Sequence, residues 1–297
     1  MNQVSTIDTN NFSAMAQAMG MNADAPKQSA KASTLARLRI HHSPIMGQQE
    51  IAGKMKNVEV VSGGTYKLEI PDGPTYYAES VSIRPYLQRF MHKKFVMGND
   101  TRPNRYVKTI MANDLNADMK DNDGGFNCGK PAGFIQDWAA LPDNMKDLIR
   151  SIKRVRALFG VVEMVNPTDD QGNSVDVEST PFIWEIDNRD AFKTVGKVFA
   201  DLTKMRRLPP QHYVSMTTTE VPLPNGSSFY VPNTSLDLNN TLDMDNEAQE
   251  NFANFMAWIE NYNTYILNSW DENMHKNEEV DTETVEEFVD IEAEDFV

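Results

Sequence analysis

Cysteine and long apolar runs are both scarce in this sequence. Cys128 is the only cysteine in 297 residues, which excludes an internal disulfide and a cysteine-based zinc site and suits a reducing, intracellular compartment. No run of eighteen apolar residues occurs, so no transmembrane helix is expected. The first twenty residues, MNQVSTIDTNNFSAMAQAMG, lack a basic start and a continuous apolar stretch, so we expect no secretory signal, a cytoplasmic location and no membrane partner.

Catalytic motifs are also absent. The segment GGTYKLE lacks the spacing of a phosphate-binding loop, and there is no HExxH, GxSxG or paired CxxC. His41 and His42 have no clear third metal ligand nearby. The loop DLNADMKDNDGG has carboxylates at 114, 118, 121 and 123, which do not match calcium-loop spacing. These residues fit a solvated acidic loop. The alternative is a metal-dependent nuclease that uses these aspartates. We expect no enzyme, no cofactor and no metal site.

Charge is distributed unevenly along the chain. The net charge is −15, yet the segment from Leu236 to Val297 holds eighteen of the 43 acids and only one of the 28 bases, Lys276. Residues 1–235 are therefore mildly basic, and a strongly acidic end follows them. This asymmetry is typical of nucleic-acid interaction combined with an acidic tail.

Apolar periodicity and turn residues predict an α+β chain. Strands are expected on both sides of Ser62 to Gly64 within 57–70, and at 75–97, 105–112, 156–165, 180–186, 212–221 and 227–232. Helices are expected at 141–155, 188–208 and 247–270. The order is too irregular for a doubly wound parallel sheet, so we expect a small barrel or open sheet with helical insertions. The predicted parts are a flexible arm (1–34), a nucleic-acid-binding body (35–235), an amphipathic helix (236–270) and a disordered acidic tail (271–297).

The most informative stretch is RPYLQRFMHKKFVMGNDTRPNRYVK, residues 84–108. It holds seven bases against one acid, with aromatic residues between them. Basic side chains neutralise the phosphates of a single strand, and aromatic rings stack on its bases, each stacked base contributing about 1–3 kcal/mol. On a strand, Arg84, Tyr86 and Gln88 share one face, and Arg89, Met91 and Lys93 share the other. A sheet with inward-packed rings and solvated bases is the alternative.

Candidate nucleic-acid-binding residues come from this stretch, from Tyr77 before it, and from a second basic group around residues 150–156. Basic residues at a helix C-terminus are also favoured by the helix dipole alone, so the second group has a structural alternative. The candidates are Tyr77, Arg84, Tyr86, Arg89, Phe90, Lys93, Lys94, Arg105, Tyr106, Lys108, Arg154 and Arg156.

The acidic tail contains apolar residues at intervals, among them Val285, Phe288 and Phe296. Acids with interspersed apolar groups imitate a phosphate backbone with bases, so the tail can occupy the chain's own groove or dock on a basic patch of a partner. Phe288, Asp295 and Phe296 are the candidate partner-binding residues. A solubilising tail is the alternative. Deleting residues 271–297 is expected to tighten single-strand binding.

The segment KASTL, followed by Arg37 and Arg39, suggests a second contact. A basic arm with serine and threonine can dock on the acidic region of a neighbouring copy, which predicts self-association. A disordered linker is the alternative reading of the same residues.

A basic, aromatic, β-rich body followed by a helix and an acidic tail ending beside phenylalanine resembles the single-stranded DNA-binding proteins of tailed phages. The resemblance covers residues 50–297 and is one of architecture and tail. It implies an OB-fold barrel, protection of single-stranded DNA during replication and recombination in the host cytoplasm, and contacts of Phe296 with a polymerase, helicase or primase. Some members hold a structural zinc through Cys and His, so this chain resembles the zinc-free members. A viral structural or assembly protein is the alternative class.

Overall fold

The computed structural model describes residues 35–51, 53–98, 103–224 and 226–294, and at 49, 51 and 275–294 the backbone only. The chain divides into two units, Met1–Ala32 and Ser33–Val297, and all elements below belong to the second. The predicted arm at 1–34 and the predicted partner-binding residues Asp295 and Phe296 lie outside the described residues. Phe288 lies within the backbone-only part.

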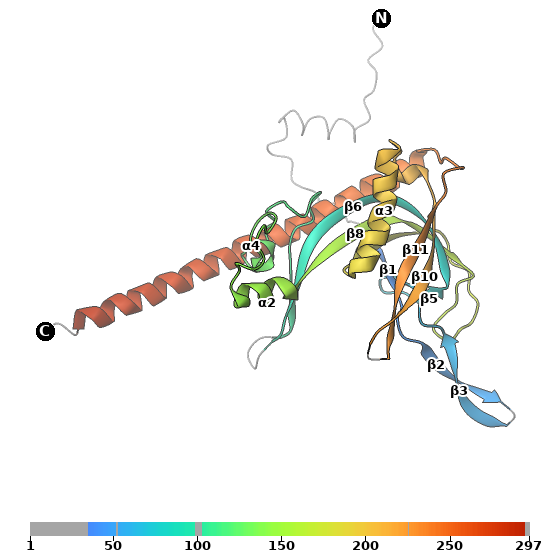
Figure 1. Ribbon diagram of the computed structural model, residues 1–297, viewed down its shortest axis with the longest axis horizontal. Coiled ribbons are helices and arrows are strands. Elements are labelled where there is room, and N and C mark those ends of the chain that lie inside the picture. Colours follow the sequence, from blue (N-terminus) through green and yellow to red (C-terminus); the bar gives the residue numbers. More distant parts are fainter. Residues whose placement is uncertain (1–34, 52, 99–102, 225, 295–297) are drawn as a thin grey trace, which may run out of the picture. The chain divides into compact units, whose positions relative to one another are not determined.

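A nine-stranded sheet forms the centre of the described unit (Figure 1). Its order is β11-β10-β6-β8-β9-β1-β4-β5, with β7 paired to β6. The strands are β1 (Ala36–Ile40), β4 (Tyr66–Glu69), β5 (Thr75–Ala78), β6 (Ser80–Val96), β7 (Arg105–Lys108), β8 (Ile152–Val165), β9 (Thr180–Ile186), β10 (Val214–Pro222) and β11 (Ser228–Leu236). Only β1 and β9 pair in parallel. A separate hairpin consists of β2 (Ile45–Ile51) and β3 (Lys54–Val61).

The α+β class is confirmed, but within the described residues the sheet is open. No pairing joins β5 to β11, so the closed barrel that the resemblance implied is not found. The reason lies in strand β8, whose residues Val155, Arg156, Ala157, Leu158 and Phe159 are buried on both faces. A strand that is buried on both faces requires a cover on each side, which favours a sheet between helices over a barrel with one wet face.

Three helices surround this sheet in the described residues: α2 (Asp143–Ser151), α3 (Arg189–Lys204) and α4 (Asn246–Glu294), with short 3-10 turns at η1 (Asn127–Gly129) and η2 (Pro209–Gln211). The side chain of Asn188 caps α3 by accepting from the backbone N–H groups of Asp190 and Ala191. Helix α2 ends at Ser151, before the predicted end at 155. The next residue already pairs with β6, because ladder pairing outweighs local helix preference there.

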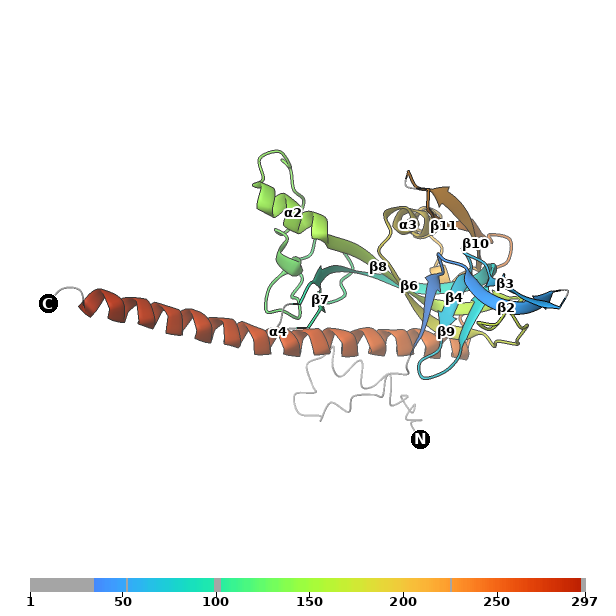
Figure 2. The same cartoon turned by 90° about the horizontal axis from the view of Figure 1, so that it is seen from below.

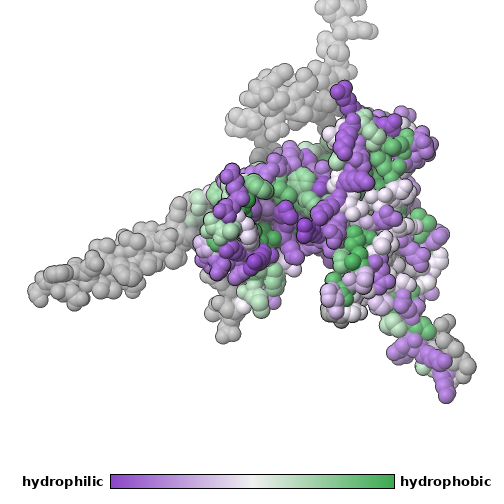
Figure 3. Space-filling model, viewed as in Figure 1, coloured by the Kyte–Doolittle hydropathy of each residue, from purple (hydrophilic) through white to green (hydrophobic). Residues whose placement is uncertain are grey.

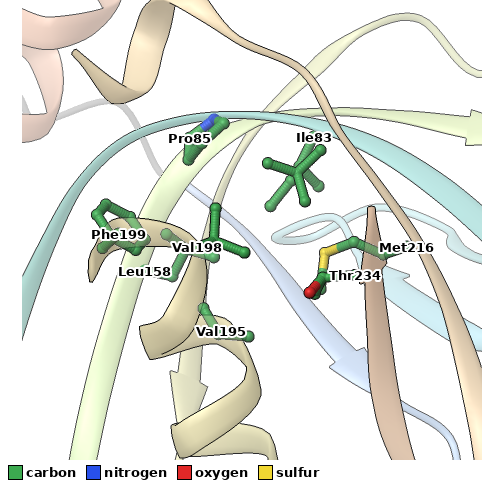
Figure 4. Close-up of a pocket in the computed structure, with 9 residues that line it drawn as sticks. Ile83, Pro85, Leu158, Val195, Val198, Phe199, Met216 and Thr234 are labelled. Carbon is green, nitrogen blue, oxygen red and sulfur yellow. The ribbon is translucent and has the colours of Figure 1, made fainter. Parts of the chain in front are cut away.

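The sheet is the middle layer of three. Figure 2 shows α4 on one side of it and α2 and α3 on the other, and we call these sides the α4 side and the α3 side. On the α3 side, the core contains Leu158, Trp184, Ile186, Val195 and Leu202. A cavity of about 10 Å³, space for little more than one water, lies there (Figure 4). Its lining is Ile83, Pro85, Leu158, Val195, Val198, Phe199, Val214, Met216 and Thr234.

On the α4 side, the core contains Met91, Val155 and Phe159 from the sheet and Phe255 and Ile259 from the helix. Each such side chain contributes about 1.5–3 kcal/mol by its removal from water. The helix predicted at 247–270 is confirmed, and its buried face includes Phe255, Ile259 and Ile266, whereas Phe252 and Met256 are exposed.

Helix α4 differs from the prediction at its end. We expected a helix to Trp270 and a disordered tail after it, whereas the helix continues to Glu294. Glutamate is a good helix former, and Val285, Phe288 and Val289 have the i, i+3, i+4 spacing of one helical face. In the described part of the chain, no helix has the length and apolar character needed to cross a membrane.

Candidate nucleic-acid interface

The predicted binding residues do not share one surface. Consecutive strand residues point to opposite faces, so Lys93 lies on the α4 side and Lys94 on the α3 side. Arg89, Met91 and Lys93 share a face as predicted. The predicted grouping of Tyr86 with Gln88 is wrong, because β6 has a bulge between Pro85 and Leu87 that breaks the alternation.

On the α4 side, two of the predicted bases, Lys93 and Lys108, are already ion-paired. Glu185 on β9 accepts from Nζ of Lys93 at 3.5 Å and from Nζ of Lys108 at 3.3 Å. Burial raises the pKa of Glu185, but Lys108 and Lys93 outweigh it and hold the pKa below its ordinary value. One carboxylate faces two ammonium groups here, so the cluster keeps one net positive charge, less than two unpaired lysines would present.

Three further predicted arginines are also engaged. Arg84 donates to the carbonyl oxygens of Pro210 at 2.7 Å and Asp243 at 2.6 Å, and so ties β6 to the segments flanking β10 and β11. Arg89 donates to Sδ of Met256 on α4. Arg105 forms a bidentate pair with Asp123. These contacts fix loops and helices to the sheet, which is a structural role.

The predicted rings are mostly covered. Tyr77 is buried beside His41, and Tyr86 is buried against Phe255 with ring centroids 5.3 Å apart. Neither ring can stack on a base in this conformation. Tyr106 is half exposed on the α4 side and lies 5.2 Å from the ring of Phe95. Phe90, on the α3 side, is partly buried.

The α3 side has four cations that contact only neutral groups. Lys94 donates to the carbonyl oxygen of Cys128 at 2.9 Å, and Lys130 donates to those of Pro131 and Gly133 at 3.0 and 2.9 Å. Arg154 is exposed and forms no ion pair, and Arg156 bonds the amide oxygen of Gln88. Among the described residues, none of the four pairs with a carboxylate. We call Lys94, Lys130, Arg154 and Arg156 the cationic patch.

Arg156 shows how the fold maintains this unpaired charge. Its guanidinium lies 5.0 Å from the ring centre of Phe90 and 4.3 Å from that of Phe192, and the residue is 7% exposed. Cation–π contacts therefore replace a carboxylate. Nε has no hydrogen-bond partner among the described residues. Burial lowers the pKa of Arg156 to about 10. A Cβ at Gly196 of α3 would collide with this guanidinium.

His92 lies beneath the patch, directly across the strand pair from Arg154. It is 1% exposed, and neither ring nitrogen has a well-formed hydrogen bond in the described region. Burial, with smaller contributions from Lys130 and Arg154, lowers the pKa of His92 to about 4. Burial and then Arg154 also lower the pKa of Lys130. Lys130 and Arg154 therefore lie close enough to repel each other, and a bound anion would reduce this repulsion.

Sequence reasoning missed several residues on this side. Lys130 and Phe192 are not among the predicted binding residues. Arg189 and Lys193 are exposed on α3 and are four residues apart, on the helical stripe beside Phe192 and Gly196. Helical periodicity identifies that stripe, but only the packing of α3 shows that it borders the patch. Figure 3 shows hydrophilic residues over the surface between α2 and α3.

The acidic loop is organised by its own backbone. The carboxylate of Asp121, 2% exposed, accepts from the N–H groups of Asp123, Gly125 and Cys128 at 2.9–3.0 Å. Asp123 pairs with Arg105. In the ranges that the structure describes, no three His, Cys, Asp or Glu side chains are placed to share a metal ion. The geometry thus assigns these carboxylates to loop structure.

The patch as a whole presents several unneutralised cations beside partly buried rings. Such an arrangement can bind a flexible polyanion. Comparisons of the chain with protein families, with curated proteins and with solved structures found no match. Its function has therefore to be inferred from its own residues.

Proposed function

We propose that this chain is a non-enzymatic single-stranded DNA-binding protein and that the strand binds on the α3 side of the sheet. The observation that carries the proposal is the cationic patch, four cations that contact neutral groups, whereas Lys93 and Lys108 on the α4 side pair with Glu185. A fold that leaves charges unpaired loses stability, so such a cluster is expected where an anion completes it.

A nucleic-acid strand suits this patch better than a small anion. The cations are distributed along the sheet and the adjoining loop instead of converging on one point, since Arg154 and Arg156 are two residues apart on β8 and Lys94 lies on β6. The phosphates of a nucleic-acid strand likewise form a row of charges instead of a single point. Phe90 and Phe192 add aromatic surface at one end of the patch.

The biological setting of the proposal comes from the sequence resemblance. In that setting the open sheet is related to the OB-fold, and the chain protects DNA during replication and recombination in phage-infected cells. The acidic tail recruits replication proteins through Phe288, Asp295 and Phe296. Binding of RNA is an outcome that the same assay measures.

The test uses two adjacent residues with opposite environments. Arg154 and Lys153 are both exposed, but Arg154 lies across from His92 on the α3 side, while Lys153 lies across from Lys93 on the α4 side. Arg154→Gln is expected to weaken binding of a labelled oligo-dT roughly fivefold, the effect of a contact of about 1 kcal/mol. It should also reduce the slope of log affinity against log salt by about 0.7.

Lys153→Gln is the matched control, because it removes the same charge one residue away. It is expected to leave affinity and salt slope close to those of the wild type. An equal loss in both variants indicates attraction by net charge alone and contradicts a site on the α3 side. Absence of oligo-dT binding by the wild type at low salt contradicts the proposal as a whole.

A further inference from the structure

The loop between η1 and α2 exposes two large aromatic side chains. Phe134 is 84% exposed and Trp138 is 40% exposed. The sequence analysis assigned no role to these two rings. Two rings held in water within five residues of each other form an apolar surface that a folded chain normally covers.

The exposure is imposed by the loop's own hydrogen bonds. Nζ of Lys130 binds the carbonyl oxygens of Pro131 and Gly133, and Gly133 has φ +71, so the chain turns sharply just before Phe134. The carboxylate of Asp137 accepts from the N–H groups of Ala139 and Ala140 at 2.9 and 3.2 Å. These bonds hold the turns on either side of Phe134 and Trp138, so the loop fixes both rings in exposed positions.

The same loop is attached to the cationic patch. Lys130, which closes the turn before Phe134, belongs to the patch and lies within electrostatic reach of Arg154. The guanidinium of Arg150 lies 5.8 Å from the ring centre of Trp138, and α2 leads directly into β8. Figure 2 shows α2 and the green loop before it on the side of the sheet opposite α4.

We propose that Phe134 and Trp138 are the base-stacking residues of this interface, with the phosphates of the same strand on Lys130 and Arg154. This inference rests on the proposed function and extends it. The predicted rings Tyr77 and Tyr86 are buried, so these exposed rings take the role that the sequence assigned to them. The occupant is a single strand, because its phosphates complement the adjacent cations and its unpaired bases offer free faces, whereas a duplex covers them.

The test separates bases from phosphates. Binding of oligo-dT is compared with binding of an abasic deoxyribose-phosphate strand of equal length. Phe134→Ala and Trp138→Ala are each expected to weaken oligo-dT binding roughly 5- to 100-fold, the range for loss of one stacked base. Binding of the abasic strand and the salt slope should change less than about twofold, because every phosphate contact remains. Tyr265→Ala, on α4 and 65% exposed, is the matched control and should leave both affinities unchanged.

The outcomes distinguish this inference from the proposed function. If both ring variants bind oligo-dT like the wild type while Arg154→Gln weakens both strands, the strand binds the patch and the rings do not stack, which overturns the inference alone. If the ring variants weaken both strands equally, the rings act on loop structure, which also overturns it. If the wild type binds neither strand, the proposed function fails and the inference with it.

Discussion

Two buried polar side chains near the cationic patch differ in how well their hydrogen bonds are satisfied. Asp121 accepts three backbone N–H groups and so fixes the loop that ends at Cys128. The ring of His92, at similar burial, has no well-formed hydrogen bond in the described region and lies next to cations. The carboxylate of Asp121 is therefore satisfied by backbone donors, whereas burial lowers the pKa of His92 and favours its neutral ring.

Replacing Asp121 with alanine is expected to destabilise the fold by about 3 kcal/mol. The substitution leaves one buried and two partly buried N–H groups without an acceptor. Each unsatisfied group costs about 1–3 kcal/mol, partly relieved by water. Urea denaturation measures the free energy of unfolding. Asp114→Ala, an exposed carboxylate in the same loop, should cost less than about 1 kcal/mol. Equal effects at the two positions would show that Asp121 does not organise the loop.

Because the ring of His92 is buried, we expect the folded chain to lose stability in mild acid. Its folded pKa of about 4 lies below the ordinary 6.5, so the unfolded chain takes up a proton that the folded chain excludes. This contribution is fully present above pH 6.5 and is lost as the pH falls from 6.5 to about 4, by up to roughly 3 kcal/mol. Unfolding free energies of the wild type and His92→Phe, measured across this range, should diverge, with the variant showing the shallower dependence. Parallel curves would contradict the assignment.

At the scale of elements, strand alternation and one bulge decide which predicted residues meet. Period-two alternation correctly grouped Arg89, Met91 and Lys93, but it failed between Tyr86 and Gln88. A signal for the bulge was present: Pro85 interrupts the strand, and Gly160 opposite it has no room for a Cβ, which would lie 2.6 Å from the carbonyl oxygen of Arg84. Proline and glycine inside paired strands commonly mark bulges.

Helix α4 is held to the acidic loop by Trp270. The ring lies 3.5 Å from Nζ of Lys120 and 5.7 Å from the ring of Phe126, and its Nε1 donates to the carbonyl oxygen of Gly125 at 2.9 Å. Trp270→Ala should therefore destabilise the chain by about 3 kcal/mol, and hydrogen exchange at 120–126 should accelerate. Tyr265→Ala on the same helix is expected to stay within about 0.5 kcal/mol of the wild type. Unchanged exchange at 120–126 would show that Trp270 is no anchor.

At the scale of the whole molecule, charge is separated along the chain. Residues 275–297 contain ten acids and one base, so their removal changes the net charge from −15 to −6. The last described side chain that binds the body is Asn273, whose amide donates to the carbonyl oxygen of Asn122. A truncation after Met274 therefore removes most of the acidic segment and keeps the anchor of α4.

This truncation is expected to tighten binding of oligo-dT at low salt, with the difference shrinking as salt increases, because the removed charges repel or compete with the strand. The measurement is a salt titration of both chains. A full-length variant with Asn and Gln at the ten acidic positions isolates charge from apolar mimicry and should bind like the truncated chain. Equal or weaker binding after truncation contradicts competition by the tail.

The sequence by itself determined the separation of charge, the α+β composition, the amphipathic character of α3 and α4, and the residue types suited to a polyanion. These are local properties, because periodicity and composition act over a few residues. Tertiary structure decided which cations remain unpaired. Lys93 and Lys108 share the carboxylate of Glu185, which is 92 and 77 residues away in the chain, while Arg154 has no such partner among the described residues. Ion pairing and the burial of rings depend on contacts between distant segments, so only the folded chain distinguishes a binding cation from a structural one.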